Sequence, residues 1–265
     1  MADSTGLGPG PYLLDKVIDE LACLDANTVS LIAPYATISK SWVSRTQHHI
    51  FKFLDLHGSG SLEKWCKKIK PDPVGVSRHT RFLMLQEIKT LEKIEAHISA
   101  FILLERLEIY DCNFLLSSVE EYFTPTASSL TNLTIHNSPT TLGVITSLIA
   151  ALHQLKHLAV EYSKITNHAD RPNPPPTIPF FQGSNSLRLQ YIDFDEDYEF
   201  DQHDFDWIPD SAWFEELEID PAHFMDMPAL MNRLFSNSCT TLTTLAVVGN
   251  PQRKSWPLEC TDSSR

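Results

Sequence analysis

Cysteine and glycine are both scarce in this chain, which has 5 cysteines and 9 glycines among 265 residues. The cysteines are odd in number and never form a Cys-x-x-Cys pair, which argues against a disulfide framework or a zinc knuckle and favours a reducing compartment, cytoplasmic or nuclear. The sequence contains no phosphate-cradling glycine loop, no Gly-x-Ser-x-Gly elbow and no His-Glu-x-x-His helix. We therefore expect a protein that is not an enzyme and holds no metal or cofactor.

Long apolar runs are also missing. The most apolar stretch, Leu142–Leu155, is short and contains Thr146, Ser147, His153 and Gln154. A membrane-spanning helix needs about 20 consecutive apolar residues. The segment Met1–Gly10 lacks a basic region followed by an apolar run, as a secretion signal would have. We therefore expect neither a membrane span nor a membrane partner.

Basic residues are scarce after position 100, where 9 Lys and Arg stand against 23 Asp and Glu. The first 100 residues are nearly balanced, with 12 against 11, so the net charge of −13 comes from the later part. Nucleic-acid binding is excluded because it requires clustered Lys and Arg. The acidic part favours a protein partner that is basic or neutral.

A repeat of the form Leu-x-x-Leu-x-(Ile/Val) runs along most of the chain. Its clearest copies are Leu104/Leu107/Ile109, Leu130/Leu133/Ile135, Leu155/Leu158/Val160 and Leu242/Leu245/Val247. Weaker copies are Phe51/Leu54/Leu56, Thr80/Leu83/Leu85, Leu189/Ile192/Phe194 and Phe214/Leu217/Ile219. The central residues of the eight copies are 29, 24, 26, 25, 34, 25 and 28 residues apart. Most of these intervals lie in or just above the range of leucine-rich repeats.

The ninth position of the repeat is where leucine-rich repeats use Asn or Cys to hydrogen-bond the turning backbone. This chain has Cys112 and Asn250 there, whereas Ile88 and Ala222 cannot form such a bond. The remaining copies have side chains that could form part of it: Ser59, Ser138, Ser163 and Asp197. The repeat is therefore degenerate.

Apolar stripes at helical spacing lie between consecutive strand copies, as in the segment that contains Leu142, Ile145 and Leu148. Strands that alternate with helices predict an α/β fold with a parallel sheet. We expect a curved solenoid over residues 58–250, with helices on the convex side, followed by a polar tail over residues 251–265. Three short helices are predicted before it, over Tyr12–Leu24, Thr28–Tyr35 and Thr37–Phe51.

Two loop segments invite functional interpretations. The proline-rich stretch Arg171–Pro179 favours a stiff connector inserted in one repeat, with a proline-rich ligand for another domain as the alternative. Alternate carboxylates from Asp193 onward resemble a calcium loop, but Tyr198 and Asp204 occupy the positions where an EF-hand needs Gly and Glu. A solvated acidic loop is favoured there, with a substrate-contacting loop as the alternative.

The helical segment carries a family resemblance. Pro11-Tyr-Leu-Leu-Asp-Lys-Val-Ile-Asp-Glu-Leu21, Ser39-Lys-Ser-Trp-Val-Ser-Arg45 and His48-His-Ile-Phe51 together resemble the F-box of fungal F-box proteins with leucine-rich repeats. In that family the motif opens with Leu-Pro and then Glu. Here Gly10-Pro11 replaces Leu-Pro, and Tyr12 stands where Glu is usual. The resemblance defines an F-box-like module over residues 9–57.

The resemblance implies a substrate-recognition subunit of an SCF-type (cullin-RING) ubiquitin ligase. The helical module would dock onto the Skp-family adaptor, and through it onto a cullin, while the repeats bind a protein substrate. The adaptor-facing positions that match are Pro11, Leu13, Leu14, Val17, Ile18, Leu21, Ile38 and Trp42. Independently of the family, about forty residues are too few to bury all these side chains among themselves.

Substrate recognition is expected between the apolar positions of each strand, because side chains alternate between the two faces of a sheet. The residues predicted at strand centres are Glu108, Thr134, Asp193 and Glu218. Two alternatives remain open at this point. The helical trio could be only a cap on the first repeat, and the chain could be a leucine-rich repeat interaction scaffold that is not coupled to ubiquitination.

Overall fold

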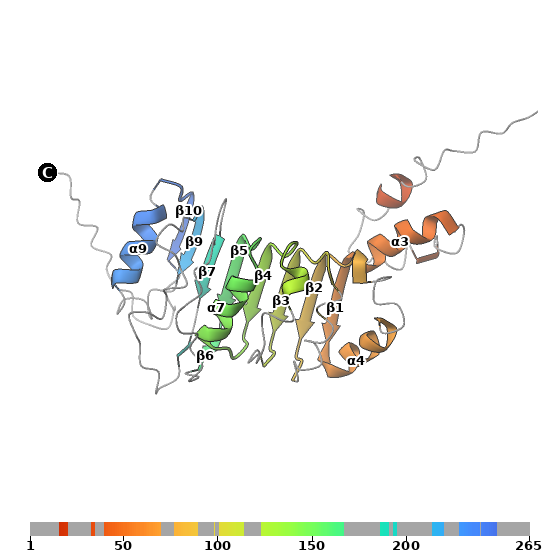
Figure 1. The fold of residues 1–265 in the computed structure, drawn as a ribbon, viewed down its shortest axis with the longest axis horizontal. Helices are drawn as coiled ribbons and strands as arrows, with labels where there is room; N and C mark the ends of the chain where they lie inside the picture. Colours follow the sequence, from red (N-terminus) through yellow and green to blue (C-terminus); the bar gives the residue numbers. More distant parts are fainter. Residues whose placement is uncertain are drawn as a thin grey trace, which may run out of the picture.

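The computed structural model describes residues 16–20, 33–34, 40–69, 77–89, 98, 101–113, 123–166, 186–190, 193–194, 214–219, 228–238 and 240–247. Eight strands form one parallel sheet whose order follows the chain (Figure 1). They are β1 (Phe53–His57), β2 (Phe82–Gln86), β3 (Arg106–Tyr110), β4 (Asn132–His136), β5 (His157–Glu161), β7 (Ser186–Gln190), β9 (Glu216–Ile219) and β10 (Thr244–Val247). The predicted α/β class with a parallel sheet is confirmed.

The repeat sets the register of the sheet. The middle leucines of the repeat, each the second residue of its strand, pair in one continuous row: Leu54, Leu83, Leu107, Leu133, Leu158, Leu187, Leu217 and Leu245. A second row two residues later consists of Leu56, Leu85, Ile109, Ile135, Val160, Leu189, Ile219 and Val247. A slip of one residue would move every apolar side chain to the other face, so the pattern specifies the pairing strongly.

The predicted sixth strand was wrong by five residues. The sheet uses Leu187 as the central leucine of β7, not Ile192, and Asp193 lies in a two-residue strand, β8 (Asp193–Phe194). Strand β8 pairs with β6 (Lys164–Ile165) in a separate small sheet. With Leu187 in place, the intervals on either side become 29 and 30 residues, so the apparent interval of 34 disappears.

Helices connect several of the strands and cover one face of the sheet (Figure 1). They are α4 (Gly58–Ile69), α7 (Leu142–Ala151) and α9 (Pro228–Ser238), with short 3-10 helices η2 (Ser77–His79) and η3 (Thr124–Thr126). Helix α7 begins at an N-cap, where the Thr141 hydroxyl accepts a hydrogen bond from the Val144 N–H at 3.1 Å. This helix matches the apolar stripe that predicted it.

Among the described residues, one apolar core lies between the strand leucines and the helices. Leu62 of α4, Leu148 of α7 and Leu234 of α9 belong to the same buried cluster as the strand residues. Burying one such side chain fully contributes about 1.5–3 kcal/mol. The side chains on the sheet face that packs against these helices therefore stabilise the fold and are not accessible to a partner.

Each of the first five strands is followed by the same turn. The residue four positions after the central leucine has a positive φ in every case: Gly58, Glu87, Asp111, Asn137 and Tyr162. Only glycine adopts this conformation freely, so four of the five turns hold a strained residue in place. The N–H of Glu87, for example, donates to the Tyr110 carbonyl of the next strand at 3.0 Å.

A ladder of small polar side chains supports these turns from inside. The N–H groups of Ile88 and Cys112 donate to Cys112 Sγ at 3.4 Å and to Ser138 Oγ at 3.1 Å. The N–H of Ser138 continues the series to Ser163 Oγ at 3.4 Å. Cys112, Ser138 and Ser163 thus hydrogen-bond the turning backbone at the repeat position predicted for that task, and all three are buried.

The N-terminal part is helical where the structure describes it. Residues 16–20 are helical within the first predicted helix, and α3 (Lys40–Lys52) occupies most of the third and leads directly into β1. From the second, Ala33 and Pro34 belong to a 3-10 turn. The remaining residues of the trio lie outside the described ones, so the three-helix module stays a prediction.

Candidate protein-interaction surface

The sheet has one face turned away from the core, which we call the open face. It carries the side chains that alternate with the two apolar rows. Its central row is Asp55, Met84, Glu108, Thr134, Ala159, Arg188, Glu218 and Ala246. The entry row, at the strand starts, is Phe53, Phe82, Arg106, Asn132, His157, Ser186, Glu216 and Thr244. The exit row, at the strand ends, is His57, Gln86, Tyr110, His136, Glu161 and Gln190.

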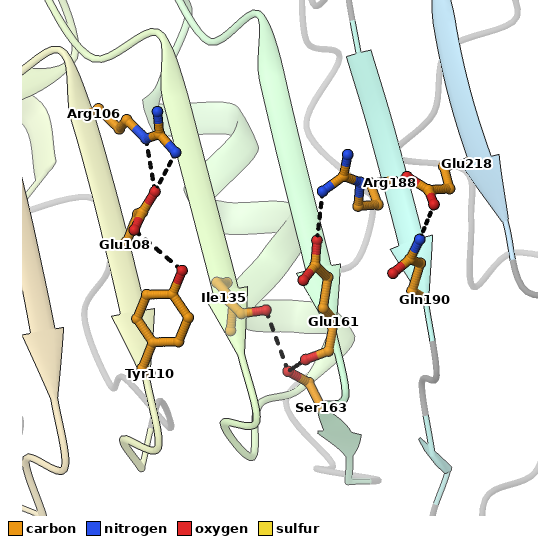
Figure 2. A network of polar contacts seen from close by, with 9 residues as sticks. All are labelled: Arg106, Glu108, Tyr110, Ile135, Glu161, Ser163, Arg188, Gln190 and Glu218. Atoms are coloured by element: carbon orange, nitrogen blue, oxygen red, sulfur yellow. Dashed lines mark hydrogen bonds and ion pairs between the residues drawn. The ribbon is translucent and has the colours of Figure 1, made fainter. Parts of the chain in front are cut away.

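Strand β3 places a buried carboxylate on the open face. Glu108 is only 3% exposed, and its Oε1 and Oε2 accept hydrogen bonds from Arg106 Nε at 2.7 Å and from the Tyr110 hydroxyl at 3.1 Å (Figure 2). Burial raises the pKa of Tyr110, and the neighbouring charge of Glu108 raises it further. Tyr110 is therefore held as a neutral hydrogen-bond donor.

A second network spans β5, β7 and β9. Arg188 lies between two carboxylates, with its Nη1 3.0 Å from Glu161 Oε1 and its Nε 2.5 Å from Glu218 Oε2. Gln190 donates to the other oxygen of Glu218, so the carboxylate is held from both sides (Figure 2). Burial lowers the pKa of Arg188, but the hydrogen bond to Glu161 and the charge of Glu218 outweigh it and raise that pKa.

Aromatic side chains form two groups on and beside the open face. The rings of Phe53 and Phe82 meet edge to face at 4.6 Å between centroids, and the Arg106 guanidinium lies 4.9 Å from the Phe82 centroid. At the exit row, His136 lies between Tyr110 and Tyr162, with centroid distances of 5.1 and 5.0 Å. Phe53 and Tyr162 remain 48% and 49% exposed, which makes them available to a partner.

The structure places the four predicted substrate-binding residues in different environments. Thr134 and Glu218 lie at strand centres on the open face, as expected, and both are partly exposed. Glu108 has the predicted position, but Arg106 and Tyr110 cover its carboxylate. The predicted placement of Asp193 was wrong, because the strand centre at that place in the sheet is Arg188, and its substrate contact stays a prediction.

Sequence reasoning missed several residues of the open face. Arg188 and Gln190 were missed because Ser184 stands where the repeat normally has its first leucine, which hid the true register. The narrow range of intervals between the middle leucines, 24 to 30 residues once Leu187 is included, would have found it. Phe53 and Phe82 were missed because they directly precede the central leucines, a position that the pattern leaves unspecified.

Three of the predicted adaptor-facing residues are described. Val17 is 44% exposed, Ile18 is 1% exposed and packs within the chain, and Trp42 on α3 is partly buried. The others lie outside the described residues: Pro11, Leu13, Leu14, Leu21 and Ile38. Within the described part of the helical segment, Val17 offers the open apolar surface that a partner could cover.

An ion pair fixes this segment to α3. The Asp19 carboxylate accepts hydrogen bonds from Arg45 Nε and from the His49 ring, both at 2.7 Å. The bond from Arg45 lowers the pKa of Asp19 to about 2, against the opposing effect of burial. A depressed carboxylate pKa stabilises the fold above its unfolded value of about 3.8, and this contribution is lost as the pH falls toward about 2.

Histidines join α3 to the start of the sheet. The His48 ring on α3 meets the His79 ring of η2 at 6.0 Å and the His49 ring at 5.2 Å, edge to face in both cases. Burial lowers the pKa of His48 and of His79, and nearby positive groups lower both further, among them Arg78 and Arg81 for His79. Both rings are therefore favoured in the neutral form.

Neither a metal centre nor a membrane span emerges from the part of the chain that the structure describes. No group of three or more His, Cys, Asp or Glu side chains there is arranged to hold a metal ion. Of the helices described, none is both long and apolar enough to cross a bilayer.

Comparison with known proteins adds no relative: no family model, no curated protein and no solved structure matches the chain. Function has to be inferred from the residues of this chain and their contacts.

Proposed function

We propose that the chain is a substrate-recognition subunit of an SCF-type (cullin-RING) ubiquitin ligase. Its N-terminal helical segment docks onto a Skp-family adaptor, and the sheet, as a leucine-rich repeat solenoid, binds a protein substrate. The observation that carries the proposal is the pairing of two features in one molecule. An N-terminal helical segment with exposed apolar surface runs directly into a parallel sheet whose face away from the core is polar and aromatic.

The connection between the two parts supports a presenting role. Helix α3 ends at Lys52 and β1 begins at Phe53, so no linker separates the helical segment from the sheet. Asp19 ties the preceding helical residues to α3 through Arg45 and His49. A subunit that holds a substrate at a defined distance from an adaptor requires this kind of stiff junction.

The dimensions of the open face support protein binding. Strands in a sheet lie about 4.8 Å apart, so eight of them span about 34 Å. A standard protein interface buries about 800 Å² on each partner, which such a face can supply. Exposed aromatic rings such as those of Phe53 and Tyr162 are enriched at protein interfaces.

The first test is co-expression of the full chain with a Skp-family adaptor, followed by purification through a tag on the adaptor. The wild-type chain is expected to co-purify in equal amounts. The Val17→Asp variant and the Leu14→Asp plus Trp42→Ala double variant are expected to lose the adaptor, because a charge or a truncation is placed in the apolar contact.

Leu245→Asp is the matched control. Leu245 is 48% exposed and Val17 is 44% exposed, but Leu245 lies in the last strand of the sheet. The control variant should still bind the adaptor. Adaptor binding that survives in all variants would reject the helix assignment. A wild-type chain that fails to bind would favour the interaction scaffold without ligase coupling.

A further inference from the structure

We propose that the open face binds an extended basic segment of its protein partner, in which an apolar residue lies on Phe53 and Phe82 and a Lys or Arg lies at Glu161 and Glu218. The inference rests on the proposed function in that it names the class of substrate. It depends only on the sheet, so it can be tested independently of the adaptor.

The charges of the open face favour a basic partner. The described strands place five carboxylates on it, Asp55, Glu108, Glu161, Glu216 and Glu218. They place two guanidinium groups there, those of Arg106 and Arg188. The excess of negative charge is greatest over β5, β7 and β9. There Arg188 pairs with both Glu161 and Glu218. Glu216 adds a third carboxylate, which is exposed. Two carboxylates share one guanidinium here, so the Glu161–Arg188–Glu218 group keeps a net negative charge, and each carboxylate retains acceptor sites for an incoming cation.

Both guanidinium groups are already paired, which disfavours a phosphorylated segment. Arg106 contacts Glu108, and Arg188 contacts Glu161 and Glu218. A phosphate group adds about 1.5 to 2 negative charges and is usually bound by arginines that are free to turn toward it. On the described strands of this sheet, a phosphate would have to displace a carboxylate from each arginine.

The aromatic pair at the start of the sheet supplies an apolar anchor. Phe53 is half exposed, and its contact with the Phe82 ring orients it on the open face. Aromatic side chains lose little conformational entropy when a partner covers them. The Arg106 guanidinium beside Phe82 shows that a cation is accommodated against these rings as well.

The strand order sets the spacing of the two contacts. Four strand intervals separate β2 from β7 in the sheet. At about 4.8 Å each they amount to about 19 Å across the strands, and the step from the entry row to the central and exit rows adds about 7–13 Å along them. The two contacts are therefore about 20–23 Å apart, which an extended chain crosses in about six or seven residues. Between the two ends, a segment that follows the exit row passes the rings of Tyr110, His136 and Tyr162, whose spacing of 5.0 to 5.1 Å matches that of the strands.

The test is selection of a randomised 12-residue peptide library, displayed on phage, against the immobilised full chain. Enriched peptides are expected to carry an aromatic or aliphatic residue about six or seven positions from a Lys or Arg. The most enriched peptide, synthesised with a fluorescent label, is expected to bind more weakly as salt rises, because ion pairs are screened. No enrichment, enrichment of acidic peptides, or binding that does not respond to salt would overturn the proposal.

Two pairs of variants locate the contacts with the same labelled peptide. Glu218→Gln should weaken binding about tenfold, whereas Glu63→Gln, which changes the same charge on α4, should leave it unchanged. Phe53→Ser should weaken binding, whereas Leu245→Ser, at an equally exposed position, should not. Replacing the basic residues of the peptide with phosphoserine should abolish binding, and tighter binding would overturn the proposal.

The peptide and the adaptor give separate answers. Peptide binding without adaptor binding keeps the open-face inference and rejects ligase coupling. Adaptor binding without enrichment of basic peptides keeps the proposed function and rejects the basic segment as its substrate class.

Discussion

At the scale of single residues, the charged side chains of the open face form ion pairs and hydrogen bonds with their neighbours. Glu108 is buried at a strand centre, where a carboxylate is stable only if it is paired and hydrogen-bonded. Arg106 and Tyr110 provide this pairing from the same strand, at positions two residues away on either side. The network therefore depends on the alternation of side chains within one strand.

Removing the cation should expose this dependence. Arg106→Ala leaves the Glu108 carboxylate with Tyr110 alone and should lower the free energy of unfolding by about 1–3 kcal/mol. This loss is smaller than the loss from breaking a fully buried ion pair, because half of the Arg106 side chain is exposed. Urea denaturation measures the change. The matched control is Arg81→Ala, whose contacts with Glu105 and with the Leu103 carbonyl are both exposed, and it should cost less than about 1 kcal/mol.

The sequence predicted the alternation but not the pairing. Leu107 and Ile109 indicate that Glu108 faces away from the core, yet nothing in the spacing shows that Arg106 and Tyr110 fold over it. Arg188 was not predicted at all, because a single Ser at position 184 broke the leucine pattern. Side-chain contacts across strands depend on register, and register is a property of the assembled sheet.

At the scale of elements, strands β2 to β5 are each followed by a turn that the next repeat supports. Ser138 Oγ accepts a hydrogen bond from the Cys112 N–H and donates to the His136 carbonyl at 2.8 Å. The small side chain fits because the turn is buried and closely packed. The ninth-position rule predicted this role from the sequence, although serine is not the usual residue there.

Ser138→Ala should therefore be more costly than an ordinary serine substitution. It leaves the Cys112 N–H without its acceptor in a buried place, which costs about 1–3 kcal/mol. The comparison is Ser129→Ala, because Ser129 hydrogen-bonds at a partly exposed turn and should cost less than about 1 kcal/mol. Equal losses in thermal or urea unfolding would contradict the ladder.

The junction between α3 and η2 should be sensitive to acid. Because the pKa values of His48 and His79 lie below the unfolded value of 6.5, the unfolded chain binds protons first as the pH falls. Stability from these two groups is complete above about pH 6.5 and is lost below it. The Asp19 carboxylate does not contribute in this window, because it titrates between about 3.8 and about 2.

Urea midpoints at pH 7.5 and pH 5.5 measure this effect. The wild-type chain should have the lower midpoint at pH 5.5, and His79→Gln should reduce the difference because it removes one of the two rings. A His57→Gln control changes an exposed histidine that pairs with Glu87, and it should keep the wild-type difference. An unchanged difference in His79→Gln would show that the junction does not sense protonation.

At the scale of the whole molecule, one row of eight leucines joins the strands into a single sheet. The sequence predicted seven of these strands because their apolar pattern is local. It could not predict the contacts of the open face or of the helical segment, which depend on side chains brought together from distant repeats. The N-terminal helices were predicted from an apolar stripe and a family resemblance, and only part of them is described.

Position in the row should determine how much each leucine contributes. Leu133 is 1% exposed in the middle of the sheet, whereas Leu245 is 48% exposed in its last strand. Leu133→Ala should cost about 2–5 kcal/mol because it leaves a cavity among packed neighbours, and Leu245→Ala less than about 1 kcal/mol. Chemical denaturation of both variants checks the ranking. Equal costs would contradict a core that is centred on the middle strands.

The most direct measurement is the affinity of the purified full chain for a purified Skp-family adaptor, by titration calorimetry. A recognition subunit built in this way should bind one adaptor per chain with a dissociation constant below about 1 µM. Leu245→Asp should match the wild type, and Val17→Asp should bind far more weakly. No heat of binding by the folded wild-type chain at concentrations up to about 100 µM would contradict the proposed function.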